Sequence, residues 1–158
     1  MKKTIFISEE QEKYLNENKG LLFEYYEQIS NPRGDTKILG DLQIWIYGND
    51  RQDFTPHCHI MTKDKSTEFE VSIINWNIIN VKNGKPTKDM KDRFFRWLNS
   101  NSTKFNGMKN KNVLFATWDG NNPNNDLLTF MSEHSISAED DDLAEYLDSQ
   151  LKLEGNED

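Results

Sequence analysis

The sequence has a single cysteine, Cys58, among its 158 residues, which excludes an internal disulfide framework and every zinc site built from cysteine pairs. No apolar run approaches the roughly 20 residues of a membrane-spanning helix. The first residues also lack the apolar core and cleavage site of a secretory signal. No glycine-rich phosphate loop, Cys-x-x-Cys pair or Gly-x-Ser-x-Gly elbow is present, so nucleotide hydrolases, thiol oxidoreductases and serine hydrolases are not indicated. We therefore expect a soluble, cytoplasmic protein without a membrane partner.

The charge of the chain is distributed unevenly. The net charge is −8, but ten acidic residues and one basic residue, Lys152, fall between residues 133 and 158. The stretch from Lys82 to Lys111 has the opposite sign, with nine basic residues against Asp89 and Asp92. We therefore expect a neutral body that carries one basic face and ends in an acidic tail.

The hydrophobic periodicity predicts an α+β fold. A helix is expected over residues 8–30, and period-two alternation over residues 37–81 predicts a small, mainly antiparallel sheet of about four strands. An amphipathic helix over residues 87–105 should pack across that sheet. We assign residues 1–132 to a single domain and residues 133–158 to an acidic tail with a short amphipathic helix.

The most informative segment is Pro56-His57-Cys58-His59. On a strand, His57 and His59 point to the same face, where two imidazoles can bind one divalent transition metal ion. A metal ion needs at least a third ligand, and the sequence does not place the side chains that could supply it. These candidates are Asp50, Asp53, Glu68, Glu70 and His134.

Two metal-free interpretations of the histidine pair stay open. His57 and His59 could act as general acid and base, with Arg51 or Lys63 holding an anionic substrate. Alternatively, they lie on an edge strand that begins at the preceding proline, and they hydrogen-bond to neighbouring loops. In every case Cys58 should point to the opposite face, which disfavours a Cys-His nucleophile and indicates a core position.

The basic stretch is the second candidate site. Cations interleaved with aromatic rings are typical of surfaces that bind single-stranded nucleic acids. However, Phe94, Trp97 and Phe105 follow the helical stripe and are expected in the core. The residues that remain for nucleic-acid or partner binding are Lys88, Lys91, Arg93, Phe95 and Arg96.

The acidic terminal segment carries a leucine stripe. Leu143, Leu147 and Leu151 recur every four residues and so share one helical face. This helix could fold against the basic helix of its own chain, or it could place the three leucines in the groove of a basic protein partner. The charge run also fits a simple solvated appendage, so both this role and docking stay open.

One segment resembles a known family. Leu42-Gln43-Ile44-Trp45-Ile46-Tyr47, followed by Pro56-His57-Cys58-His59-Ile60, resembles the small bacterial proteins of domain-of-unknown-function family 4160. In that family a helix with a Trp-Leu pair, here Trp97-Leu98, follows the strands. The resemblance covers about residues 41–118. It implies an interaction or regulatory role, because members are suspected to form toxin–antitoxin-like pairs with a small partner protein.

Two functional hypotheses follow. The first is a bacterial or phage protein that acts through a macromolecular partner, either toxin–antitoxin-like or regulatory. The abundance of Asn and Lys suits the AT-rich genome of such a bacterium or phage. The second is a metal-dependent hydrolase in which His57 and His59 bind the metal. RNA could be its substrate, and the basic helix would then hold the phosphates.

Overall fold

The fold is built on one antiparallel sheet. The computed structural model describes residues 25–48, 55–105 and 107–155. In this part of the chain five strands pair in chain order, where about four were expected, and the α+β class is confirmed. The strands are β1 (Tyr25–Gln28), β2 (Leu42–Gly48), β3 (His57–Thr62), β4 (Glu68–Ser72) and β5 (Ile78–Asn83).

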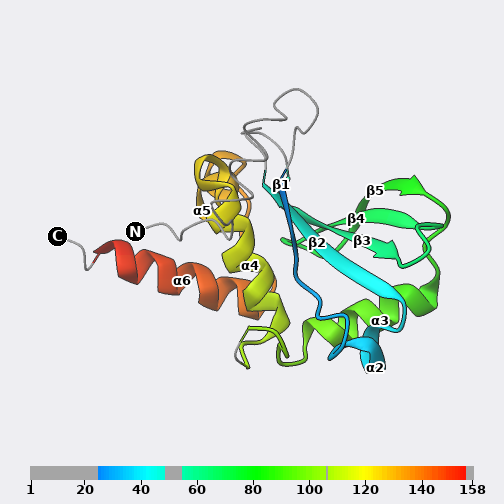
Figure 1. Cartoon of the computed structure of the whole chain (residues 1–158). Helices are drawn as coiled ribbons and strands as arrows, with labels where there is room; N and C mark the ends of the chain where they lie inside the picture. The colour runs from blue at the N-terminus through cyan, green and yellow to red at the C-terminus, as the bar shows by residue number, and fades with distance from the viewer. Residues whose placement is uncertain (1–24, 49–54, 106, 156–158) are drawn as a thin grey trace, which may run out of the picture.

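Most of the helices follow the sheet in the chain. They are α2 (Thr36–Leu39), α3 (Lys88–Leu98), α4 (Asn110–Asn121), α5 (Leu127–Glu133) and α6 (Asp141–Gly155), with a 3-10 turn, η1 (Pro123–Asn125), before α5. Figure 1 shows α3 along one face of the sheet and α4 between the sheet and α6. Of the helices in the described residues, none combines the length and the apolar composition that crossing a membrane requires.

The two faces of the sheet differ because neighbouring residues of a strand point to opposite sides. On β3, Cys58 and Ile60 face the core, whereas His57 and His59 face the other side. Strand register continues the core face across the sheet. The side chains of this core face are at most 4% exposed, and they are Leu42, Ile44, Ile46, Cys58, Ile60, Phe69 and Val71.

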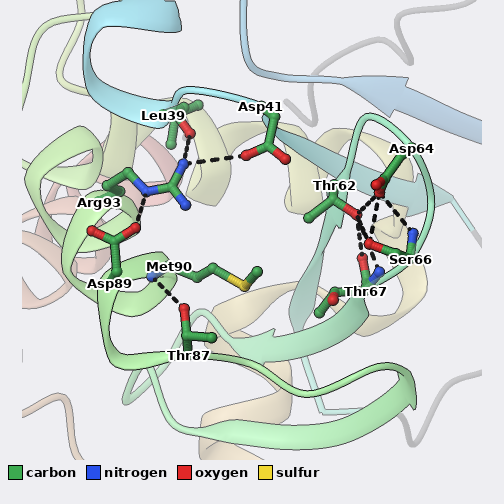
Figure 2. A network of polar contacts seen from close by, with 10 residues as sticks. All are labelled: Leu39, Asp41, Thr62, Asp64, Ser66, Thr67, Thr87, Asp89, Met90 and Arg93. Carbon is green, nitrogen blue, oxygen red and sulfur yellow. Dashed lines mark hydrogen bonds and ion pairs between the residues drawn. The ribbon is translucent and has the colours of Figure 1, made fainter.

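Helix α3 covers the core face. The side chain of Thr87 caps its N-terminus by accepting a hydrogen bond from the backbone N–H of Met90 at 3.1 Å (Figure 2). Apolar residues recur on one side of the helix, and Phe94, Trp97 and Leu98 are buried there. Lys88, Lys91 and Arg96 are exposed on the other side of the helix.

Arg93 fastens α3 to the beginning of β2. Its guanidinium donates to the carbonyl oxygen of Leu39 at 2.5 Å and lies 3.3 Å from Asp41 Oδ1 and 2.9 Å from Asp89 Oδ2 (Figure 2). The close approach requires Gly40, which has a φ of 63° and at which an added Cβ atom would lie 2.6 Å from Arg93 Nη1. Arg93 is thus a structural link between two elements.

One aspartate organises the turn between β3 and β4. Asp64 Oδ1 accepts hydrogen bonds from the hydroxyl of Ser66 at 2.7 Å, from its backbone N–H at 2.9 Å and from the hydroxyl of Thr62 at 2.8 Å (Figure 2). These bonds favour the carboxylate and lower the pKa of Asp64 to about 2, with Ser66 as the largest cause. The ordered turn fixes the register of β3 against β4, on which the candidate site depends.

The acidic helix α6 packs on the domain. Leu143 is fully buried in the hydrophobic core, and Tyr146 OH donates to Asp119 Oδ2 of α4 at 2.5 Å. Burial, followed by the charge of Asp119 and this hydrogen bond, raises the pKa of Tyr146. The segment predicted as a tail therefore contributes to the core of the fold.

A tryptophan links the β4–β5 turn to the same helix. Trp76 Nε1 donates to Asp140 Oδ2 at 2.6 Å, and Lys111 Nζ lies 3.0 Å from that oxygen. Trp76 has a φ of 64°, which costs an L-residue roughly 1–2 kcal/mol. The indole also packs against Phe115 at 5.9 Å between ring centroids, so these contacts hold the residue in a strained conformation.

Three predicted boundaries differ from the structure. Of the helix expected over residues 8–30, residues 8–24 lie outside the described residues. Tyr25–Gln28 is a strand, because pairing with β2 overrides local spacing, and Ile29 and Ser30 after it are not helical. The segment expected to open the sheet at residue 37 forms α2 instead, and β2 begins at Leu42. The helix expected over residues 87–105 ends at Leu98, since the polar residues that follow favour turns over helix.

Candidate metal centre

The two histidines lie on the middle strand of the sheet. His57 and His59 project from β3 to the same face, as the His-x-His spacing predicts, and they are 7% and 2% exposed. The interpretation that placed them on an edge strand is wrong, because β2 and β4 pair with β3 on its two sides. Cys58 is fully buried on the opposite face, as expected, and burial raises the pKa of its thiol.

Strand β4 supplies a carboxylate to this pair. Glu70 lies directly opposite His59 in the register, and its Oε1 atom is 3.3 Å from Nε2 of His57. One ligand atom from each of these three residues lies within 4.8 Å of the other two. His57, His59 and Glu70 therefore form a buried group that could hold a metal ion, and this group is the candidate metal centre.

The tautomer of His57 suits a metal ligand. Its Nδ1 atom is 2.7 Å from the carbonyl oxygen of Thr55, which can only accept a hydrogen bond, so Nδ1 carries a proton and donates. In a neutral ring the lone pair then lies on Nε2, the atom that faces Glu70. A backbone carbonyl on the outer nitrogen is a common way to orient a metal-ligating imidazole.

His59 is held neutral. Burial, followed by electrostatic repulsion from His57 and Lys82, lowers its pKa to about 3. Since a metal ion binds the neutral imidazole, no proton has to leave His59 at neutral pH. Its Nδ1 atom lies 3.5 Å from Oε2 of Glu68, so this second carboxylate borders the centre without joining the three ligands.

Strand β5 completes the polar surroundings of Glu70. Asn80 donates its side-chain N–H to Oε2 of Glu70 at 2.9 Å, and Lys82 Nζ lies 3.7 Å from the same oxygen. The two oxygens of Glu70 thus have different neighbours, because Oε1 faces His57 and Oε2 faces β5. This division orients the carboxylate toward the histidines.

Aromatic rings border the centre. The ring centroids of Tyr47 and His59 are 4.1 Å apart, and those of Trp118 and His57 are 5.6 Å apart. Asn122 Nδ2 donates to the carbonyl oxygen of Tyr47 at 3.3 Å and so joins the end of α4 to β2 beside the histidines. These rings reduce contact with water, which strengthens electrostatic interactions at the centre.

One ligand separation and the ligand types agree with tetrahedral zinc. Two ligands at the usual zinc distances of about 2.0–2.1 Å, at tetrahedral angles, are roughly 3.4 Å apart. The separation of 3.3 Å between His57 Nε2 and Glu70 Oε1 agrees with this value. Two histidines and one glutamate are also a ligand set of catalytic zinc sites, in which the fourth position stays open.

The other predicted ligands do not join the group. Asp50, Asp53 and Arg51 lie outside the described residues. His134, at the C-terminus of α5, stacks on Phe130 with ring centroids 4.1 Å apart, and its Nδ1 lies 2.9 Å from the carbonyl oxygen of that residue. Lys63 is exposed and lines a separate cavity of about 260 Å³.

The predicted basic surface on α3 is partly neutralised. Lys88 pairs with Asp92 at 2.8 Å, and Arg93 is held by the contacts described above. Lys91 and Arg96 are exposed and form no ion pair with any described residue. Phe95 is 40% exposed, as its position off the helical stripe predicts. None of these α3 residues lies at the candidate metal centre.

The leucine stripe of α6 is divided between core and surface. Leu143 is fully buried, Leu147 packs against the core from a partly buried position, and Leu151 is 52% exposed. The helix packs on α4, with Lys109 and Lys111 of the basic stretch 3.1 Å and 3.2 Å from Asp142. The alternative in which it folds against the basic helix of its own chain is wrong about the neighbour, because α6 packs on α4 and not on α3.

Sequence reasoning missed the residues that surround the ligands. Tyr47, Asn80, Lys82 and Trp118 reach the centre through strand register or helix packing, which single-sequence patterns do not reveal. Asn80 and Lys82 do occupy alternate positions that place both on one face of β5, and this was the available signal.

Comparisons of the chain with models of known families, with curated proteins and with solved structures find no match. The resemblance to family 4160 stays a prediction.

Proposed function

We propose that the protein is a metal-dependent hydrolase whose centre binds one divalent transition metal ion, zinc by its ligand set, through His57, His59 and Glu70. The observation that supports this most directly is the convergence of one ligand atom from each residue within 4.8 Å. A bound metal ion would supply a Lewis acid and a water molecule of lowered pKa at the open position. The three ligands hold it, and the nearby rings limit access of bulk water.

The side chains around the ligands have separable roles in this proposal. Thr55 fixes the His57 tautomer through its carbonyl oxygen, and Asn80 orients Glu70. Glu68 lies beside His59 with 23% of its side chain exposed, so it can accept a proton from a water molecule at the centre. None of these three groups has to bind the metal to perform its role.

The basic helix is not part of the proposed centre. The histidines and Glu70 project from one face of the sheet, and α3 packs on the other. Lys91 and Arg96 therefore cannot hold a phosphate of a substrate whose reacting group is at the metal. This arrangement favours a small substrate over a long RNA strand that contacts α3 and the centre together.

Zinc titration against a chromophoric chelator tests the proposal. The wild-type protein is expected to bind one equivalent, and His57→Ala, His59→Ala and Glu70→Gln should each weaken binding by about 100-fold or more. His134→Ala is the matched control, because this histidine lies outside the group. A wild-type protein that binds no zinc, or variants that bind it as tightly as the control, would contradict the proposal. Hydrolysis of model esters should then be lost with chelator.

A second function, partner binding of the toxin–antitoxin-like or regulatory kind, is favoured by the outer face of α6. Asp141, Glu145 and Asp148 are exposed there, together with Leu151 at 52% exposure. Deleting the helix would remove buried Leu143 and confuse unfolding with lost binding. The suitable variant is Asp141→Asn, Glu145→Gln, Asp148→Asn. A protein retained by the wild type and released by this variant would support the role, and capture by both would count against it.

A further inference from the structure

We infer that Lys82 makes the candidate metal centre a receptor for a phosphate-type oxyanion, which bridges the metal ion and the lysine ammonium. This inference rests on the proposed function and names its substrate class, a phosphate monoester. It depends on the position of one cation beside the ligands, on the net charge of the centre and on the exposure of that cation.

Among the described residues, Lys82 is a basic residue in contact with a ligand of the centre. Its Nζ atom lies 3.7 Å from Oε2 of Glu70, whose other oxygen is 3.3 Å from His57 Nε2. The Glu70 carboxylate therefore lies between the Lys82 ammonium and the His57 imidazole. The ammonium also lies 6.0 Å from the ring centroid of Tyr47, against which His59 packs with its ring tilted by 43°.

Metal binding changes the charge around Lys82. In the absence of metal, the ammonium and Glu70 neutralise each other. A divalent ion bound by Glu70 adds two positive charges, and neutral His57 and His59 add none. Even with Glu68 counted, the centre then carries a net positive charge in surroundings of low dielectric. An anion at the open coordination position removes this excess.

A tetrahedral oxyanion matches this arrangement. One of its oxygens can occupy the open position of the metal while another accepts hydrogen bonds from the lysine ammonium. The Lys82 side chain is 42% exposed, whereas those of His57 and His59 are 8% and 3% exposed. The lysine therefore lies at the solvent side of the centre, where an incoming anion meets it first.

Calorimetric titration of inorganic phosphate into the zinc-loaded protein tests the inference, with zinc affinity measured first for each variant. Lys82→Met should weaken phosphate binding by about tenfold or more. The same variant should bind zinc as tightly as the wild type or tighter, because a neighbouring positive charge is removed. Lys85→Met is the matched control, since Lys85 is exposed, follows β5 and contacts none of the ligands.

The outcomes separate the two proposals. Normal zinc binding with equal phosphate affinity in wild type and Lys82→Met would overturn the inference and leave the proposed function standing. Failure of the wild type to bind zinc would overturn both. Phosphate that binds equally well without zinc would also overturn the inference, because the anion would then not bridge the metal. Acetate at the same concentration should bind more weakly than phosphate, and equal affinity would reject the phosphate assignment.

Discussion

The two faces of the sheet are made by the same strands and have opposite compositions. On the core face, Cys58, Ile60, Phe69 and Val71 of β3 and β4 are apolar and at most 2% exposed. On the other face, the same strands carry two histidines and two glutamates, and the histidines are also buried, at 7% and 2% exposed. Since burying polar groups costs free energy that burying apolar groups supplies, the first face maintains the fold and the second depends on it.

The comparison shows where function can lie in a small domain. Phe69 and Glu70 are adjacent in the sequence, and alternation alone assigns one to the core and the other to the candidate metal centre. A one-residue slip of the β3–β4 register would exchange the two faces. The hydrogen bonds of Asp64 fix the turn and therefore the register. The site thus depends on a turn that contains none of its ligands.

The largest expected effect breaks the core face. Phe69→Ala should lower the free energy of unfolding by about 3–5 kcal/mol, because the ring is 1% exposed and its removal leaves a cavity. Glu70→Gln, at the next residue, should change it by less than about 1 kcal/mol, since the amide oxygen can still accept from Asn80. Urea unfolding measures both. Equal losses of unfolding free energy in the two variants would mean that both faces contribute equally to stability.

The second effect appears when metal is added. Zinc at 100 times its dissociation constant should stabilise the wild-type protein by about 2.7 kcal/mol, since it binds the folded state alone. Glu70→Gln should show little of this gain because it lacks one ligand. Thermal unfolding with and without zinc measures the difference. A similar rise in melting temperature for both proteins would place the bound ion elsewhere.

The third effect concerns a polar contact that stabilises the fold, the contact of Asp140 with Trp76 and Lys111. Burial alone would raise the pKa of Asp140, but hydrogen bonds from Trp76 and Lys111, with the charge of Lys111, hold it below its ordinary value of 3.8. A depressed pKa in the folded state gives stability that is present above pH 3.8 and is lost as the pH falls through the folded-state value.

Asp140→Asn should therefore cost about 1 kcal/mol at pH 7, and this cost should shrink below pH 3.8. Urea unfolding of wild type and variant across this range gives the difference directly. Asparagine keeps one side-chain oxygen to cap α6, but an NH₂ group replaces the oxygen that accepts from Trp76. The change of the cost with pH, and not its size at pH 7, therefore reports the charge. A cost that is independent of pH would show that Asp140 acts through its shape and not through its charge.

The smallest effect lies outside both faces. Lys88→Ala should leave the free energy of unfolding unchanged within error, because its pair with Asp92 is exposed to solvent. Arg93→Met on the same helix should be clearly destabilising, since that side chain is 18% exposed and bonded to the carbonyl oxygen of Leu39. Chemical unfolding of the two variants side by side is the check. Equal behaviour would remove the distinction between exposed and anchoring cations on α3.

Sequence reasoning recovered what depends on local alternation. His57 and His59 share a face and Cys58 lies in the core because these positions follow from the strand period alone. The helix after the sheet was found for the same reason, through its stripe of Phe94 and Trp97. The fold class and two of the three candidate ligands were thus predictable from the sequence.

What the sequence did not reveal depends on register and distant packing. Glu70 was one of five candidate ligands, and only the pairing of β3 with β4 sets it opposite His59. Tyr25–Gln28 belongs to a stretch whose spacing also fits a helix, and pairing with β2 decides it. Leu143 reaches the core only because α4 offers a surface to an otherwise acidic helix.

The chain order of the strands has a consequence for synthesis on the ribosome. Each strand pairs with the one made just before it, so the sheet can grow in step with the emerging chain. The candidate ligands His57, His59 and Glu70 fall within one hairpin and can meet early. The bond from Trp76 to Asp140, by contrast, joins residues 64 positions apart. We therefore expect the three ligands to come together first and α6 to pack onto the nascent domain last.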